Sequence, residues 1–244
     1  MKFLFSACGM IYASKLKDIK KKGGSNMHIE PGFVSAAKVM GANAAVVGLL
    51  VFYLKRLIRH PLDILKVLLA AVFFSVFMQS FHMSVGPSEL HFIGAMSIYL
   101  TLGFIPTMFG FAVGLLLQGL LFEPMDLPHL AVNSLSLIVP LITVHYVAGR
   151  KLFVKGLRQR VSWSTILKLD GIYYVGVTSM VGFWLLIGEV ETPFSAWMAF
   201  ASSYLAVVAV EPFITLLTVK TLKRYENSPA VKRLFIVDKL RLEA

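Results

Sequence analysis

The stretch LHFIGAMSIYLTLGFIPTMFGFAVGLLLQGLLF, residues 90–122, runs for 33 residues without an Asp, Glu, Lys or Arg. A single transmembrane helix needs about 20 apolar residues, so this stretch is too long for one span. The segment Gly103-Phe104-Ile105-Pro106 is the natural interruption. The stretch therefore predicts two consecutive membrane helices, one on each side of that segment.

The composition of the whole chain agrees with a membrane protein. Of the 244 residues, 57% are hydrophobic and only 15% are charged, and the mean hydropathy is +0.74. Soluble domains have about 25% charged residues. The net charge of +11 is concentrated in blocks between apolar runs, a pattern that indicates orientation in a bilayer rather than nucleic-acid binding. One cysteine, Cys8, excludes an intramolecular disulfide and a cysteine-rich metal site.

Five further apolar runs surround the central stretch and complete a predicted all-α integral membrane protein of about seven transmembrane helices. They cover residues 33–57, 62–81, 129–147, 163–187 and 194–219. Residues 1–26 are expected to be a leader that is removed or disordered, or the product of a misassigned start. Residues 27–220 are expected to form the seven-helix transmembrane domain, and residues 221–244 a basic cytoplasmic tail. The sequence shows no soluble domain and no strong internal repeat.

The loops predict how this bundle lies in the membrane. Basic blocks follow the first, fifth and seventh predicted helices, and acidic loops follow the fourth and sixth. Because Lys and Arg are retained on the cytoplasmic side, we expect the N-terminus, counted from Met27, outside and the C-terminus inside. The six Lys of residues 1–26 would then lie on the wrong side, which favours Met27 as the true start.

The segment Met27-His28-Ile29-Glu30-Pro31-Gly32 contains a possible metal-chelating hook. If the chain starts at Met27, the α-amine of Met27 and the amide and imidazole Nδ1 of His28 form two fused chelate rings around a metal. A second imidazole would complete a planar set of four nitrogens, which suits Ni(II) or Cu(II). A preceding residue would convert the amine into a peptide nitrogen, which is a poor ligand. The alternative is that Met27-His28 is an ordinary dipeptide before a helix.

Two histidines on the predicted outer side are candidates for the second imidazole. His91 is expected at the start of the third helix, and an intramembrane imidazole is a functional hypothesis by default. His82, at the end of the second helix, is the second candidate. Glu89 could orient a ligand or cap the third helix, and we favour the cap.

Other polar groups have simpler explanations. Gln118 and Asn133 flank the loop after the fourth helix, and hydrogen bonds between helices are at least as plausible for them as metal contact. Glu211 is the only clearly midspan acid identified, and its role is not assigned. The sequence contains no phosphate-binding G-x-x-x-x-G-K-[ST] loop, no G-x-S-x-G elbow and no sign of an enzyme.

Three of these segments, in order, resemble the CbiM/NikM family. Met27–Gly32 resembles its N-terminal M-H-I-x-x-G, and residues 85–94 are similar to its V-G-P-[TS]-x-x-H stretch. Residues 117–122, LQGLLF, followed by Asn133, are similar to its L-Q-x-x-L-F…N pattern. The chain departs from the family in its leader and in residues 123–126, Glu-Pro-Met-Asp, where many members have a glycine-rich turn.

The resemblance implies a function for the chain. Members of this family are the metal-binding S components of energy-coupling-factor (ECF) transporters for cobalt and nickel, located in the prokaryotic cell membrane. Their ligands correspond to Met27, His28 and His91, and the transported ion is Co²⁺ or Ni²⁺ with no resident cofactor. Implied partners are a membrane T subunit, cytoplasmic ATPase subunits and a small accessory membrane subunit. The alternatives are a stand-alone secondary transporter or channel, which would need an ionisable relay, and a structural subunit without a ligand.

Overall fold

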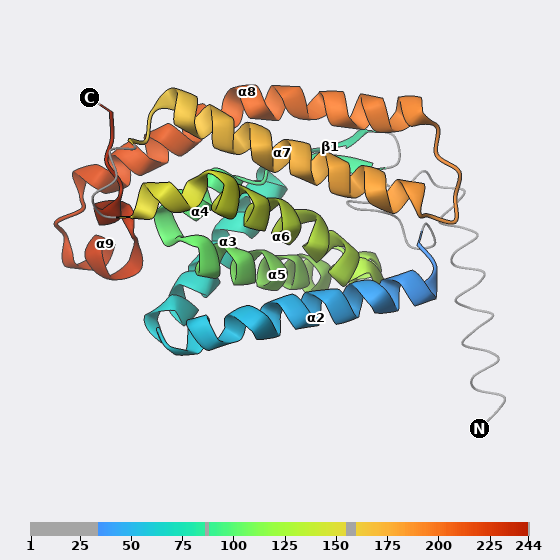
Figure 1. Ribbon diagram of the computed structural model, residues 1–244, viewed down its shortest axis with the longest axis horizontal. Coiled ribbons are helices and arrows are strands. Elements are labelled where there is room, and N and C mark those ends of the chain that lie inside the picture. The colour runs from blue at the N-terminus through green and yellow to red at the C-terminus, as the bar shows by residue number, and fades with distance from the viewer. Residues whose placement is uncertain (1–33, 86–87, 155–159, 244) are drawn as a thin grey trace.

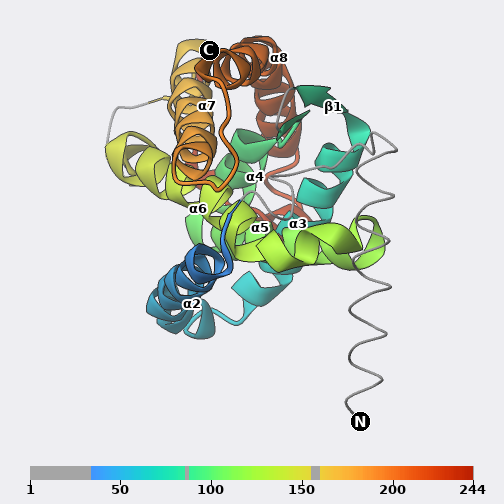
Figure 2. The ribbon, with the colours of Figure 1, turned by 90° about the vertical axis from the view of Figure 1, so that its right-hand side faces the viewer.

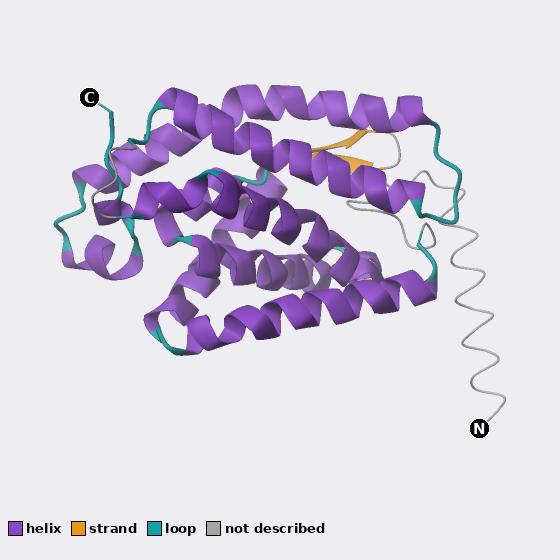
Figure 3. Ribbon diagram, in the orientation of Figure 1, coloured by secondary structure: helices purple, strands orange, loops and turns teal. Residues whose placement is uncertain are grey.

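Six helices of the computed structural model are long and apolar enough to cross a membrane. The structure describes residues 34–85, 88–154 and 160–243. The spanning helices are α2 (Ala36–Ile58), α3 (Leu62–Ser80), α5 (Phe104–Leu121), α6 (Leu130–Val147), α7 (Trp163–Leu186) and α8 (Phe194–Arg224). Figure 3 shows that helices make up almost all of the described chain, so the predicted all-α, multi-pass fold is confirmed.

One further helix, α4 (Ala95–Leu102), lies between α3 and α5 in the chain. It is short, and all eight of its residues are buried. At 1.5 Å per residue it is about 12 Å long, less than half of the roughly 30 Å hydrocarbon core. The predicted interruption is confirmed, because Gly103 separates α4 from α5. The prediction that a helix begins near Leu90 is wrong: β1 (His82–Val85) and β2 (Ser88–His91) form an antiparallel hairpin just before α4.

Gly94 makes the turn from this hairpin into α4. Its φ is +64°, a left-handed conformation that glycine adopts without steric cost. A β-carbon there would lie 2.1 Å from a ring carbon of Phe77 in α3. Both the backbone conformation and the close approach of α3 therefore require glycine at this position.

The helices pack around α4, which contacts α3, α5, α7 and α8. Helices α3 and α5 pack against each other extensively, and a β-carbon added to Gly110 would lie only 2.4 Å from Cβ of Ala70. Small residues allow this approach, as is usual between membrane helices. The packing encloses α4 within the bundle, so its backbone ends must find partners inside the protein.

The C-terminal segment folds back onto the bundle. Helix α8 continues to Arg224, one turn beyond the expected end near Val219, and is followed by α9 (Pro229–Leu234) and η3 (Val237–Lys239). The amide of Ile236 donates to the carbonyl of Thr101 at the end of α4, at 2.8 Å. Val237 is 1% exposed. Figure 2 shows the C-terminus beside α7 and α8.

Basic and acidic connections gather at opposite ends of the molecule. In Figure 1 the α2–α3 turn, α9 and the C-terminus lie at one end, and the start of α2 and the α7–α8 loop lie at the other. This separation is what the charge pattern predicts for a bundle with one cytoplasmic face. Which end faces the cytoplasm stays a prediction.

Candidate metal-binding site

The hairpin brings the two candidate histidines directly opposite each other. His82 of β1 is the register partner of His91 of β2, and side chains opposite each other in an antiparallel pair lie on the same face. Their ring centroids are 6.3 Å apart, with planes inclined by 29°. The sequence placed these residues at two separate helix ends, whereas the structure makes them neighbours.

The two imidazoles differ in exposure. His91 is 4% exposed, whereas His82 is exposed. The amide of Phe92 donates to the carbonyl of Phe81 at 3.2 Å, which continues the strand pairing past both histidines. The backbone position of His91 is therefore fixed by the hairpin, as a preorganised ligand requires.

Met27 and His28, the proposed hook, lie outside the described residues. Within the described residues, no group of three or more His, Cys, Asp and Glu has an arrangement suited to a metal. The pair of His91 and His82 therefore supplies at most part of a coordination sphere. The remaining ligands would have to come from elsewhere, and the segment that contains Met27 and His28 is the candidate from the sequence.

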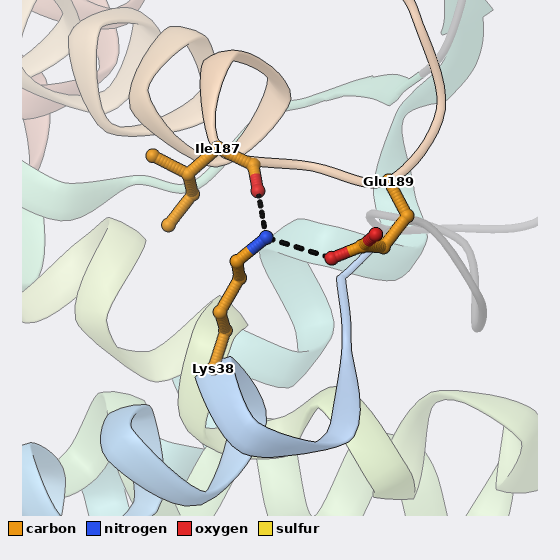
Figure 4. Close-up of polar contacts among 3 residues, drawn as sticks. All are labelled: Lys38, Ile187 and Glu189. Carbon is orange, nitrogen blue, oxygen red and sulfur yellow. Dashed lines mark hydrogen bonds and ion pairs between the residues drawn. The ribbon is translucent and has the colours of Figure 1, made fainter.

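The start of α2, which follows that segment, is anchored to the α7–α8 loop. Lys38 donates to the carbonyl of Ile187 at 2.6 Å and to Oε1 of Glu189 at 2.7 Å (Figure 4). The hydrogen bond and the positive charge of Lys38 hold the pKa of Glu189 below its ordinary value. Val34, the first described residue, is 4% exposed and packs with Ala131, Trp184 and other residues of α6 and α7.

His129, which was assigned no role from the sequence, is buried next to the start of α2. It is the last residue of η1 (Pro124–His129), is 5% exposed, and interacts with the backbone of Val34. It also interacts electrostatically with Asp126 of the same 3-10 helix. A single histidine at the end of a loop is usually exposed, so its burial could not be predicted from the sequence.

Glu89 does not lie at the start of a helix. It lies in β2, paired in register with Ser84, and α4 begins only at Ala95 with Gly94 at its N-cap position. The prediction of a cap assumed that a helix starts near Leu90, which the hairpin replaces. A direct role for Glu89 in orienting a ligand stays a hypothesis.

Gln118 connects two helices. Its Oε1 accepts from Nε2 of Gln79 at 2.7 Å, and its Nε2 donates to the carbonyl of Ser75 at 3.1 Å. Gln118 is 1% exposed, so both ends of its amide are used to join α5 to α3. This is the interhelical hydrogen bonding that was the simpler explanation for its polarity. Asn133 is buried in the first turns of α6.

Glu211 caps α4. It is fully buried in α8, its Oε1 accepts from the amide of Met96 at 3.3 Å, and its Oε2 accepts from the hydroxyl of Tyr174. A carboxylate at a helix N-terminus is favoured by the helix dipole. Glu211 is not the only midspan acid, because Asp170 in α7 is also 0% exposed. An acid within the apolar run 163–187 was visible in the sequence and was overlooked.

The fold is similar to that of known proteins. Two solved structures share the arrangement, and they are described as crystal structures of a transition metal transporter and of a truncated transition metal transporter. The first is 22% identical with a TM-score of 0.66, covering 84% of this chain and 96% of that chain. The second is 21% identical with a TM-score of 0.64, covering 82% and 99%. At this identity the likeness establishes the fold alone. No curated protein sequence matches the chain.

A match to a family model shows which family the chain belongs to. The model of the CbiM family, described as the cobalt uptake substrate-specific transmembrane region, matches residues 28–229. This range includes all six spanning helices, the hairpin with His82 and His91, and α4. The chain therefore belongs to the CbiM family and is a transmembrane component of cobalt uptake.

Proposed function

We propose that this chain is the substrate-capture subunit of an ECF-type transporter and that it binds Co²⁺ or Ni²⁺ on the outer side of the prokaryotic cell membrane. Cobalt is favoured because the family is described by cobalt uptake. The metal ion is the transported substrate. Four nitrogens would hold it: the amine of Met27, the amide and imidazole of His28, and the imidazole of His91.

The observation that carries this proposal is the position of His91. It is buried on a hairpin strand whose pairing fixes its backbone, and a rigid, partly desolvated imidazole loses little freedom when it binds a metal. His82 lies opposite on the same hairpin and is the alternative source of the imidazole. The structural likeness to transition metal transporters supports the same class of substrate.

The energy for transport would come from other subunits. The sequence has no phosphate-binding loop, so we assign ATP hydrolysis to partner ATPases and membrane coupling to a T subunit, with a small accessory membrane subunit beside them. The chain itself then has a non-catalytic role. Co-purification of the chain with the products of neighbouring genes checks this assembly.

The test of the site compares three histidine variants of protein that begins at Met27. Loss of a residue that hydrogen-bonds to a metal ligand typically lowers metal affinity by roughly 10–100-fold. His91→Ala should lower Co²⁺ affinity by more than this, because it removes a direct ligand. His60→Ala is the matched control, because His60 is exposed in the α2–α3 turn at the other end of the bundle. Isothermal titration measures the affinity.

His82→Ala decides between the two imidazoles. If His91 is the ligand, His82→Ala should retain most of the affinity. A His91→Ala protein that binds Co²⁺ almost normally, while His82→Ala does not, would transfer the assignment to His82. Loss of binding in the His60→Ala control would show that the effect does not report on the hairpin.

A further inference from the structure

Two carboxyl groups lie inside the membrane-spanning part of the bundle, on helices α7 and α8 rather than on the hairpin that carries His82 and His91. Asp170 is in α7 and Glu211 is in α8, and each is 0% exposed. They interact electrostatically with each other. Charged side chains in a membrane interior are costly and require compensation. The surroundings of the two groups show which one is compensated.

Glu211 is compensated by hydrogen-bond donors. The hydroxyl of Tyr174 and the amide of Met96 each donate to one of its oxygens. The amide belongs to the first turn of α4, whose dipole adds favourable positive potential. Glu211 therefore has the environment of an ionised carboxylate, which is stabilised by donors to its charged form.

Asp170 has the opposite environment. Within the described residues, neither of its carboxyl oxygens has a hydrogen-bond partner. The hydroxyl of Tyr173, also 0% exposed, has none either. Tyr173 follows Asp170 by three residues and therefore lies on the same face of α7. Tyr173 also interacts electrostatically with both acids, so the Asp170 carboxyl and the Tyr173 hydroxyl are buried in one region of the bundle, each without a hydrogen-bond partner among the described residues.

No positive charge balances this pair among its described neighbours. The titratable groups that face it are Tyr173 and Tyr174 from α7 and Tyr204 from α8, and α4 contributes backbone amides. Two neighbouring carboxylates without a counter-ion cannot both ionise in a site that excludes water. One of them must be neutral, and the donors around Glu211 leave Asp170 as that one.

We propose that Asp170 is a proton-binding site in the membrane interior, which holds one proton at neutral pH beside Glu211, whose two oxygens accept from the donors described above. The bound proton makes the Asp170 carboxyl neutral, and a neutral group costs less free energy to bury without a charged partner than a carboxylate does. A larger cation does not fit as well. The described residues offer no cluster of three metal-binding side chains, and hard cations need six or more oxygen ligands or retained water.

Infrared spectroscopy of the purified protein in lipid tests the proposal. At neutral pH the wild type should show the C=O band of a protonated carboxylic acid. Labelling all aspartates with ¹³C at the side-chain carboxyl should shift this band, whereas a proton on Glu211 would leave it in place. This measurement needs no variant and remains decisive if a substitution at Asp170 prevents folding.

Variants and ions locate the proton. Asp170→Asn should abolish the band, and Asp63→Asn should retain it, because Asp63 lies outside this region and forms a 2.9 Å salt bridge with Lys66. Replacing K⁺ by Na⁺ at constant ionic strength should leave the band unchanged. Absence of the band, a band insensitive to aspartate labelling or to Asp170→Asn, or its loss in Na⁺ would each overturn the proposal.

Discussion

Replacing Gly94 by alanine should destabilise the hairpin that carries His91. A non-glycine residue in the left-handed conformation costs about 1–2 kcal/mol, and Gly94 has a φ of +64°. The new β-carbon would lie 2.1–2.8 Å from three ring carbons of Phe77, and such overpacking costs about 1–3 kcal/mol. The sum is a loss of about 2–5 kcal/mol in the free energy of unfolding.

The displacement should also reach the site. Phe77 packs edge-to-face on Phe92 with ring centroids 5.4 Å apart, and Phe92 directly follows His91. Moving Phe77 to accommodate a methyl group therefore disturbs the residue beside the candidate ligand. We expect Gly94→Ala to weaken Co²⁺ binding as well as stability.

Thermal unfolding followed by circular dichroism measures the first effect. A loss of 2–5 kcal/mol corresponds to a decrease in Tm of roughly 4–20 °C at about 2–4 °C per kcal/mol for chains of this size. Gly48→Ala is the matched control, because nothing lies within 4 Å of the added carbon and alanine favours a helix. A Gly94→Ala protein with the Tm and Co²⁺ affinity of the wild type would refute the reasoning.

Three further predictions concern Gln118, Lys38 and the orientation of the bundle in the membrane. Gln118→Leu removes both hydrogen bonds to α3 and should lower the free energy of unfolding by about 1 kcal/mol without changing Co²⁺ affinity in titrations; a large loss of affinity would instead assign Gln118 to the metal site. Lys38→Met should return the pKa of Glu189 to its ordinary range. The pKa of Glu189 is lowered in the folded state. The pair therefore stabilises the folded protein at pH values above the unfolded pKa of Glu189, and this stabilisation is lost as the pH falls through the folded pKa. The free energy of unfolding should depend less on pH across this acidic range in the variant than in the wild type, and an unchanged dependence would contradict the assignment. A reporter fused after Lys220 should read cytoplasmic and one within residues 189–192 external; the reverse pair of results would place the candidate site on the inner side.

The membrane helices were predictable because apolar length is a strong signal. The expected ends of α3, α6 and α7 agree with the structure to within one residue, and the interruption at Gly103 was correctly placed. Helix α8 passes its internal Pro212 and extends about a turn beyond the predicted end at Val219. Its basic last turn was assigned to the tail, because charge was taken as the end of the helix.

The hairpin could not be predicted from the same signal. Residues 90–102 belong to one uncharged apolar run, and a short buried strand cannot be distinguished from a helix by composition alone. What makes α4 short is remote in the chain: Glu211 of α8 accepts from Met96, and Phe77 closes on Gly94. The pairing of His82 with His91 depends on this three-dimensional arrangement, so sequence spacing alone did not reveal it.

The central claim is that a free amine at Met27 completes the metal site with His28 and His91. The most direct measurement compares Co²⁺ binding by protein that begins at Met1 with protein that begins at Met27, each verified by intact mass. An α-amine with a pKa of about 7.7–8.0 can release its proton to bind metal near neutral pH, whereas a peptide nitrogen at the same place is a poor ligand. We predict at least about a tenfold higher affinity for the form that begins at Met27, in line with the loss expected when a metal site is impaired. Equal affinity in the longer form, with residues 1–26 retained, would contradict the claim.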